Sequence, residues 1–247
     1  MQAEADNAKP RPKANLQAET PAEVYSIEEL VGGKEVMRMV GVKDWVDTVE
    51  SESEILVKSR FVAQRVEAVV RSGNVRKMKG LRYLLLLIEW YLALKPARGS
   101  SGGGAASGKN PSRSIPKEPE LSEKLPGWSQ SLLATLSARF SPSHAPPGIL
   151  NAASITLLLT TIFALTLCID DQTTDTIDIR EDLRLEPRQV NAQFSELGAR
   201  TGPLTETERT RMGVGKAEAK MHVIAKLRLP LQWPKLRIAA SARGGRR

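Results

Sequence analysis

The stretch DIREDLRLEPRQVNAQFSELG, residues 178–198, decides the fold, because it predicts two short helices joined by a tight turn. Ile179 and Leu183 are four residues apart and therefore share one face of the first helix. Pro187 suits the first position of the second helix, where its missing N–H costs no hydrogen bond. Gly198 suits the residue that ends this helix. Three apolar residues line one side of the second helix: Val190, Phe194 and Leu197.

A run of a different period follows at residues 220–229, KMHVIAKLRL. Apolar residues alternate there with mainly polar ones, at Met221, Val223, Ala225, Leu227 and Leu229. This alternation is typical of a half-buried strand. Upstream, residues 149–169 are apolar and uncharged and favour a buried helix. Three helices followed by a β hairpin is the element order of a winged helix, which we expect for residues 146–234.

A first unit, residues 23–145, is expected to be mostly helical as well. Ser26 and Glu29 have the spacing of a capping box, and Ser51 and Glu54 repeat it. The second box precedes apolar residues at helical spacing: Ile55, Val62, Val66, Val69 and Val70. The fold class we predict is mainly α with small β wings (α+β), arranged as a tandem winged helix.

Gly73 is the expected stop of the helix that follows the second box. Further helices of this unit are expected at residues 75–94 and 128–140. Between them, residues 95–119 are rich in Gly, Ser and Pro and predict a flexible insert. Residues 1–22 are polar and Pro-containing and predict a disordered, solvated tail, and residues 235–247 predict a basic C-terminal tail.

Composition limits the classes of function that the chain can serve. It has 36 Lys and Arg against 28 Asp and Glu, a net charge of +8, and 41% hydrophobic residues. The positive charge favours polyanionic partners, and the apolar content is enough for a core. One cysteine, Cys168, excludes an internal disulfide. The first residues carry no apolar segment of a signal peptide, so we expect an intracellular, basic protein.

An uncharged stretch at residues 145–169 raises the alternative of a membrane-spanning helix. Pro146, Pro147 and Gly148 shorten the usable helix, and Asp170 and Asp171 follow at once. We therefore favour a helix buried between two units, and expect no membrane partner.

No pattern in the chain indicates catalysis. Residues 103–109 imitate a phosphate-binding loop, but Asn110 replaces the hydroxyl that would bind magnesium and Pro111 follows it. His144 lies in a Pro-rich turn and His222 within the expected strand, more as a surface residue than a base. The acidic residues of 170–186 match no calcium loop. We expect no catalytic residue, no metal site and no cofactor.

Charge is segregated along the chain. Residues 71–82 and 235–247 each hold five Lys or Arg and no acid, whereas residues 170–186 hold seven acids and two Arg. Such clusters suit the neutralisation of DNA phosphates, although a solvated face and a disordered tail explain them too. On the second helix, Arg188 and Asn191 project away from the apolar side. The candidate DNA-binding residues are Arg76, Lys77, Lys79, Arg188, Asn191, Ser195, Lys220, Lys226, Arg228, Lys235, Arg237, Arg243, Arg246 and Arg247.

Several of these segments resemble the C-terminal tandem winged-helix region of the forty-nine-kilodalton subunit family of RNA polymerase I. The resemblance is most specific in the last sixty residues and covers about residues 24–240. It is carried there by IREDLRLEPRQV at 179–190, FSELGA at 194–199, KAEA at 216–219, and the strand that ends in LPL at 229–231, followed by Pro234. Upstream it is carried by KGLRYLLL at 79–86, EKL at 123–125 and LSARF at 136–140.

The resemblance implies a nuclear, nucleolar and non-catalytic polymerase subunit that binds double-stranded DNA. It also implies partners among the core subunits of RNA polymerase I and a role in initiation and elongation of ribosomal RNA synthesis. In this family a TFIIF-like domain pairs with a partner subunit, and residues 1–22 leave no room for that domain. The first wing is expected to be shortened to about residues 141–148, and the insert at 97–115 is expected to be lineage-specific.

A second class of function stays open at this point. The winged helices would then be spacers in a protein-docking module without direct DNA contact, and the basic tail would meet an acidic partner. Binding of random duplex DNA separates the two classes. A membrane-anchored protein is the third and most remote alternative.

Overall fold

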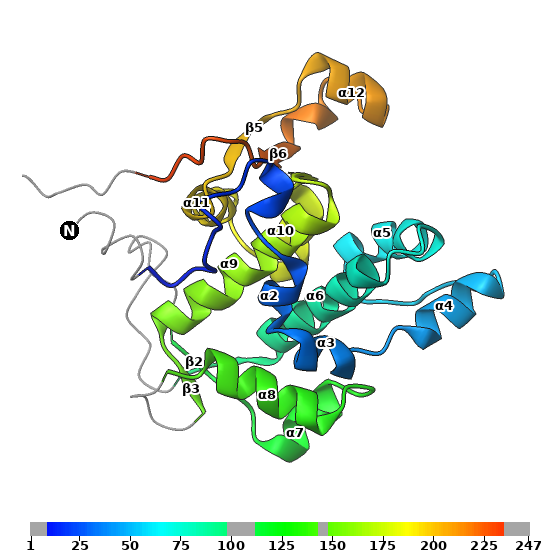
Figure 1. The fold of residues 1–247 in the computed structure, drawn as a ribbon, viewed down its shortest axis with the longest axis vertical. Helices are drawn as coiled ribbons and strands as arrows, with labels where there is room; N and C mark the ends of the chain where they lie inside the picture. Colours follow the sequence, from blue (N-terminus) through cyan, green and yellow to red (C-terminus); the bar gives the residue numbers. More distant parts are fainter. Residues whose placement is uncertain (1–8, 98–111, 143–147, 235–247) are drawn as a thin grey trace, which may run out of the picture.

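The computed structural model describes residues 9–97, 112–142 and 148–234, which form a mainly helical fold with two small antiparallel sheets (Figure 1). The predicted class of α+β is confirmed at this level. The elements up to residue 150 are η1 (Pro21–Glu23), α2 (Ile27–Val31), α3 (Lys34–Met39), α4 (Lys43–Glu50), α5 (Arg60–Arg71), α6 (Val75–Ala93), β1 (Lys95–Pro96), β2 (Arg113–Ser114), α7 (Glu118–Lys124), α8 (Gln130–Phe140) and β3 (Ile149–Leu150).

The remaining elements build the second sheet and the helices around it. They are α9 (Ala152–Ile169), β4 (Thr173–Asp175), α10 (Ile177–Leu183), α11 (Pro187–Glu196), β5 (Arg200–Pro203), α12 (Glu206–Met212), η3 (Glu218–Lys220) and β6 (Val223–Lys226). The strand order is β4-β6-β5, and all pairs are antiparallel. Ala225 in the central strand pairs with Thr174 on one side and Thr201 on the other.

Helix α9 is the centre of the core. It packs on α6, α2 and α8 from the N-terminal part of the chain and on α11 from the C-terminal part (Figure 1). Its length and composition would suit a membrane span, yet 78% of it is buried inside the structure. The prediction of a buried helix is therefore confirmed, and its apolar composition follows from contacts on several sides.

The two parts of the chain share one continuous core. Phe163 of α9 lies 4.8 Å from Phe194 of α11, between ring centroids, and both are fully buried. On another side, Gly80 lets α6 approach α2 closely, because a Cβ there would come within 2.8 Å of Ile27. β3 begins after residue 145, the expected boundary between the units, and pairs with β2.

Charged side chains join the two parts next to this core. Asp182 of α10 accepts hydrogen bonds from the Ser59 hydroxyl at 2.6 Å and from the amides of Arg60 and Phe61 at 2.9 and 3.1 Å. Arg65 of α5 forms two hydrogen bonds to Asp170, at 2.6 and 2.8 Å. The acidic segment 170–186 thus holds α5 in place.

Local signals placed several helix ends correctly. Pro187 is the first residue of α11, and Gly73 and Gly198 follow their helices with positive φ, as predicted. The second capping box is wrong, because Ser51 ends α4 and Ser59 caps α5 by accepting from the Val62 amide. Ser26 is the N-cap of α2, but its side chain makes no cap hydrogen bond. The strand is shorter than expected, and Met221 is 57% exposed.

Two segments expected to be irregular are partly built into the fold. The ends of the insert 95–119 pair as β1 and β2, and α7 follows them; residues 98–111 lie outside the described part of the chain. Residues 9–22 are not a solvated tail as far as the structure describes them. Ala14 and Ala18 pack against the core, and the Arg11 guanidinium lies 4.7 Å from the centroid of the Trp233 ring.

Candidate nucleic-acid interface

Helix α11 is stabilised by a capping box at its start and by apolar residues on its inner face. A capping box links Glu186 and Gln189, and the buried Val190 and Phe194 attach the helix to α9. Arg188 and Ala192 are exposed on the outer side. The helix therefore presents a short polar face with one arginine and a small residue that permits close approach.

Two predicted contact residues of α11 are less exposed to solvent than the sequence suggested. Asn191 and Ser195 are half-buried, and the Ser195 hydroxyl donates to the Asn191 carbonyl at 2.9 Å. The hydroxyl is thus occupied within the helix, while the Asn191 side chain has no hydrogen-bond partner among the described residues. Arg188 is the exposed cation of this face.

The connection between β5 and β6 carries α12, which projects at one end of the molecule (Figure 1). Thr205 and Glu208 form its capping box. Lys226 of β6 forms an ion pair with Glu208 across the connection. The hydrogen bonds from Lys226 and from the Thr205 amide and hydroxyl lower the pKa of Glu208 to about 2. Lys226 was predicted to face phosphates, but in the structure it fastens the connection.

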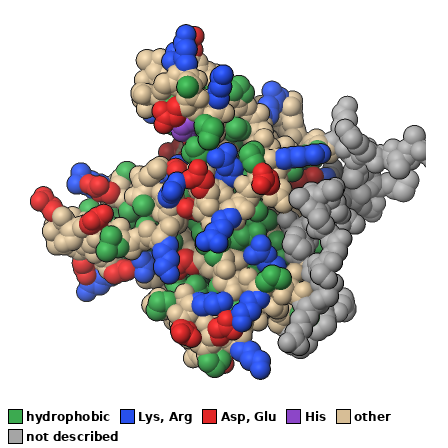
Figure 2. All heavy atoms as spheres, turned by 180° about the vertical axis from the view of Figure 1, so that it is seen from behind, with side chains coloured by type: hydrophobic (Ala, Val, Ile, Leu, Met, Phe, Trp, Pro, Cys, Tyr) green, Lys and Arg blue, Asp and Glu red, His purple; other side chains and the backbone are tan. Residues whose placement is uncertain are grey.

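Four predicted cations lie on the surface without an ion pair to any residue of the described ranges: Arg76, Arg188, Lys220 and Arg228. Sequence reasoning missed Arg200 at the start of β5 and Arg211 on α12, which are exposed too. The signal for Arg200 was its position directly after the helix-ending Gly198 and Ala199, on an arm of the predicted hairpin. Figure 2 shows Lys and Arg side chains spread over one face of the molecule, with Asp and Glu side chains among them.

The basic stretch 71–82 is used mainly inside the fold. Lys77 pairs with Asp171 at 2.6 Å, and Lys79 donates to the Met37 carbonyl at 2.7 Å. Arg82 pairs with Asp44 at 2.8 Å and lies over the rings of Trp45 and Trp128. The predicted contact residues Lys77 and Lys79 therefore have structural partners, and the structure does not bring them onto the face of α11.

The first described residues of the chain contact the C-terminal end of α11. Lys9 pairs with Glu196 at 3.1 Å, and Arg11 donates to the Glu196 carbonyl at 2.7 Å. The Tyr25 hydroxyl donates to the Leu197 carbonyl at 3.0 Å, and burial raises the pKa of this tyrosine.

The predicted contact residues after residue 234 lie outside the described residues: Lys235, Arg237, Arg243, Arg246 and Arg247.

His222 is the one histidine in the described ranges, and it is not a free surface residue as expected. Its Nδ1 forms a hydrogen bond with Asp175, and both side chains are nearly buried, which ties the residue before β6 to the last residue of β4. Within the described ranges, no three His, Cys, Asp or Glu residues are grouped to hold a metal ion.

Comparison with known proteins gives the family. A family model described as A49-like RNA polymerase I associated factor matches residues 1–234. The DNA-directed RNA polymerase I subunit rpa49 of Schizosaccharomyces pombe is 23% identical over 235 residues, which cover 93% of this chain and 51% of that protein. The subunit RPA49 of Saccharomyces cerevisiae is 22% identical over 256 residues, which cover 98% and 56%.

The chain spans about half the length of the curated relatives it matches. The family match nevertheless extends over most of the chain, including every described element. The resemblance predicted from the residues is confirmed, and the chain belongs to the family of A49-like RNA polymerase I associated factors.

Proposed function

We propose that this chain is part of a non-catalytic subunit of RNA polymerase I that supports initiation and elongation at ribosomal RNA genes. Its place of action would be the nucleus, and within it the nucleolus. The support is the family match together with two relatives that are named as subunits of this polymerase. Core subunits of the polymerase are its proposed partners, and the TFIIF-like partner subunit that the resemblance implies is a further one.

The proposed architecture is a tandem winged helix, with units at residues 23–145 and 146–234 that share a core. For the second unit, the support is the element order α9-β4-α10-α11-β5-α12-η3-β6 with a sheet in the order β4-β6-β5. This is the order in which a winged helix places its recognition helix before the wing. For the first unit, the support is its set of helices together with strands β1 and β2, which form a small sheet with β3 at the start of the second unit.

The proposed interaction is docking on duplex DNA through phosphates, with little reading of bases. The observation that carries it is the pair of exposed arginines on α11 and after β6, Arg188 and Arg228, which have no ion pair in the described ranges. Unpaired guanidinium groups neutralise phosphates without first breaking a contact of their own. The basic residues of 235–247 would add to this attraction.

Binding of a random duplex by the full chain over a range of salt concentrations tests the proposal. Arg188→Ala combined with Arg228→Ala should weaken binding for all sequences alike and reduce the salt slope by about 2, one unit for each lost phosphate contact. The matched control combines Arg38→Ala with Arg71→Ala, at side chains that are 72% and 68% exposed and pair only within their own helices. An unchanged salt slope in the first double variant would refute the proposed phosphate contacts of Arg188 and Arg228.

The tail is tested separately with Arg243, Arg246 and Arg247 changed to alanine together. Binding should weaken evenly and the salt dependence should flatten. Absence of any DNA retardation by the unmodified chain at low salt would instead favour the alternative, a protein-docking module without DNA contact.

A further inference from the structure

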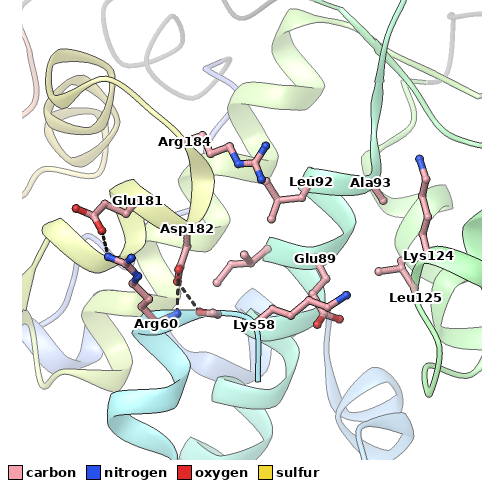
Figure 3. A pocket seen from close by; sticks show the side chains of 12 residues that line it. Lys58, Arg60, Glu89, Leu92, Ala93, Lys124, Leu125, Glu181, Asp182 and Arg184 are labelled. Atoms are coloured by element: carbon pink, nitrogen blue, oxygen red, sulfur yellow. Dashed lines mark hydrogen bonds and ion pairs between the residues drawn. The ribbon is translucent and has the colours of Figure 1, made fainter. Parts of the chain in front are cut away.

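A cavity of about 470 Å³ opens on the surface where three segments of the chain meet (Figure 3). Its walls come from the start of α5, from the last two turns of α6 and the end of α7, and from the end of α10. The cavity is thus formed only when the two parts of the chain pack together. It lies outside the set of residues proposed to contact DNA.

The floor of this cavity is apolar. Ile88, Ala93 and Leu125 line it and are buried, whereas Leu92 is 43% exposed. Leu92 belongs to α6, a helix whose other leucines are buried in the core. An accessible leucine inside a concave site is what an apolar side chain of a partner would cover.

The carboxylates of the wall are already engaged in the fold. Asp182 accepts from Ser59 and from two amides, Glu181 pairs with Arg60, and Glu89 accepts from the Trp128 indole at 2.7 Å. Their lone pairs therefore serve the structure and leave few acceptors for a bound cation.

The cations of the wall are freer. Lys58 and Arg184 form no ion pair with any residue that the structure describes, and Lys124 shares Glu120 with Lys95. Figure 3 shows Arg184 beside Leu92, Lys58 extending toward Glu89, and Lys124 on the opposite wall next to Leu125. The accessible charge of this site is positive, so its complement is an apolar group with carboxylates beside it.

We propose that this cavity binds an extended peptide of a protein partner, with one large apolar side chain on Leu92 and carboxylates facing Lys58, Arg184 and Lys124. Nucleic acid fits this site less well, because Leu92 and the apolar floor around it offer nothing to a phosphate. This peptide site is independent of the proposed DNA contact.

Fluorescence anisotropy of the full chain with a labelled peptide tests the proposal. The probe is Glu-Asp-Leu-Phe-Asp-Glu, and its charge-matched control has Ser-Ser in place of Leu-Phe. Leu92→Glu should weaken binding of the probe about tenfold, because it removes the apolar floor and adds a repelling charge. The matched control is Leu16→Glu, at a leucine that is 66% exposed and outside the cavity, and it should bind like the unmodified chain.

A second variant, Lys58→Glu, tests the charges without touching the floor and should weaken binding about fivefold. Equal binding of the Ser-Ser peptide would overturn the proposal, because the contact would then be one of charge alone. Displacement of the probe by random duplex DNA, with loss of DNA binding in Leu92→Glu, would also overturn it and assign the cavity to nucleic acid. Circular dichroism of each variant shows that it is folded.

Discussion

The two small sheets of this molecule stand in different surroundings. Strands β1, β2 and β3 have two residues each, whereas β4, β5 and β6 have three or four, and β5 packs against α11. The basic residues of the two parts of the chain differ as well. Those of 71–82 are mostly bound to carboxylates or carbonyls of the fold, and those at Arg188 and Arg228 face solvent without an ion pair to the described residues.

This difference shows that a charge count along the sequence overstates the charge available to DNA. The acidic segment 170–186 takes up cations of the N-terminal part, since Asp170 binds Arg65 and Asp171 binds Lys77. Opposite charges that are segregated in the sequence are thus partly a device for joining the two parts. Only the cations left over are candidates for phosphate contacts.

The largest expected effect tests whether the two parts unfold together. Phe194→Ala removes a fully buried ring 4.8 Å from Phe163 and should cost about 3–5 kcal/mol. Phe140→Ala is the counterpart in the other part, where the ring lies 5.8 Å from Trp90 and is 1% exposed. Because one core runs through both parts, each variant should lower the midpoint of a single transition.

Denaturant unfolding followed by tryptophan fluorescence and by circular dichroism measures this midpoint. Coincident transitions in both variants support one cooperative unit. Two separate transitions, of which only the one belonging to the mutated part shifts, would contradict it and would support independent folding of the two proposed units.

The next effect concerns the charged contact between the parts. Arg65→Ala should cost about 2–3 kcal/mol, because it removes two charge-assisted hydrogen bonds to Asp170 and leaves that nearly buried carboxylate uncompensated. Asp178 lies 3.8 Å from the same guanidinium, and burial already raises its pKa.

Arg71→Ala is the control for this variant. Arg71 is on the same helix, α5, but its pair with Glu67 is exposed, so the free energy of unfolding should change by less than about 0.5 kcal/mol. Similar losses in the two variants would show that Arg65 matters only as a helix residue.

The sequence predicted α11 and its ends because the signals for them are local. Pro187, Val190, Phe194 and Gly198 lie within one short stretch, and their spacing alone defines the helix and its buried face. The same holds for α6 and α8. The family could be predicted too, because the segments that carry it are short and continuous.

The rest depended on partners far away in the chain. Arg65 and Asp170 are 105 residues apart, and no local pattern says that they meet. The tail-like composition of residues 9–22 gave no sign that Arg11 would lie on Trp233. Lys226 was placed on the correct strand, but its pairing with Glu208 depends on how the β5–β6 connection folds back, which alternation does not encode.

The smallest expected effect concerns the Lys226–Glu208 ion pair, which fixes the β5–β6 connection. The pKa of Glu208 lies at about 2 in the folded protein against an ordinary value of 4.5, so its ionised form is favoured by folding. The stabilisation is therefore complete above pH 4.5 and is lost as the pH falls toward 2. Because Glu208 is near the surface, solvent screening limits the effect to less than about 1 kcal/mol.

Glu208→Gln should accordingly be slightly less stable than the unmodified chain at pH 6, and the gap should close as the pH falls from 4.5 to 2. Unfolding free energies measured across this range give the gap directly. Glu206→Gln is the control, because that carboxylate is on the same helix and 81% exposed. A gap that stays constant with pH would mean that Lys226 does not hold the connection through charge, and Lys226 would then return to the set of cations available to DNA.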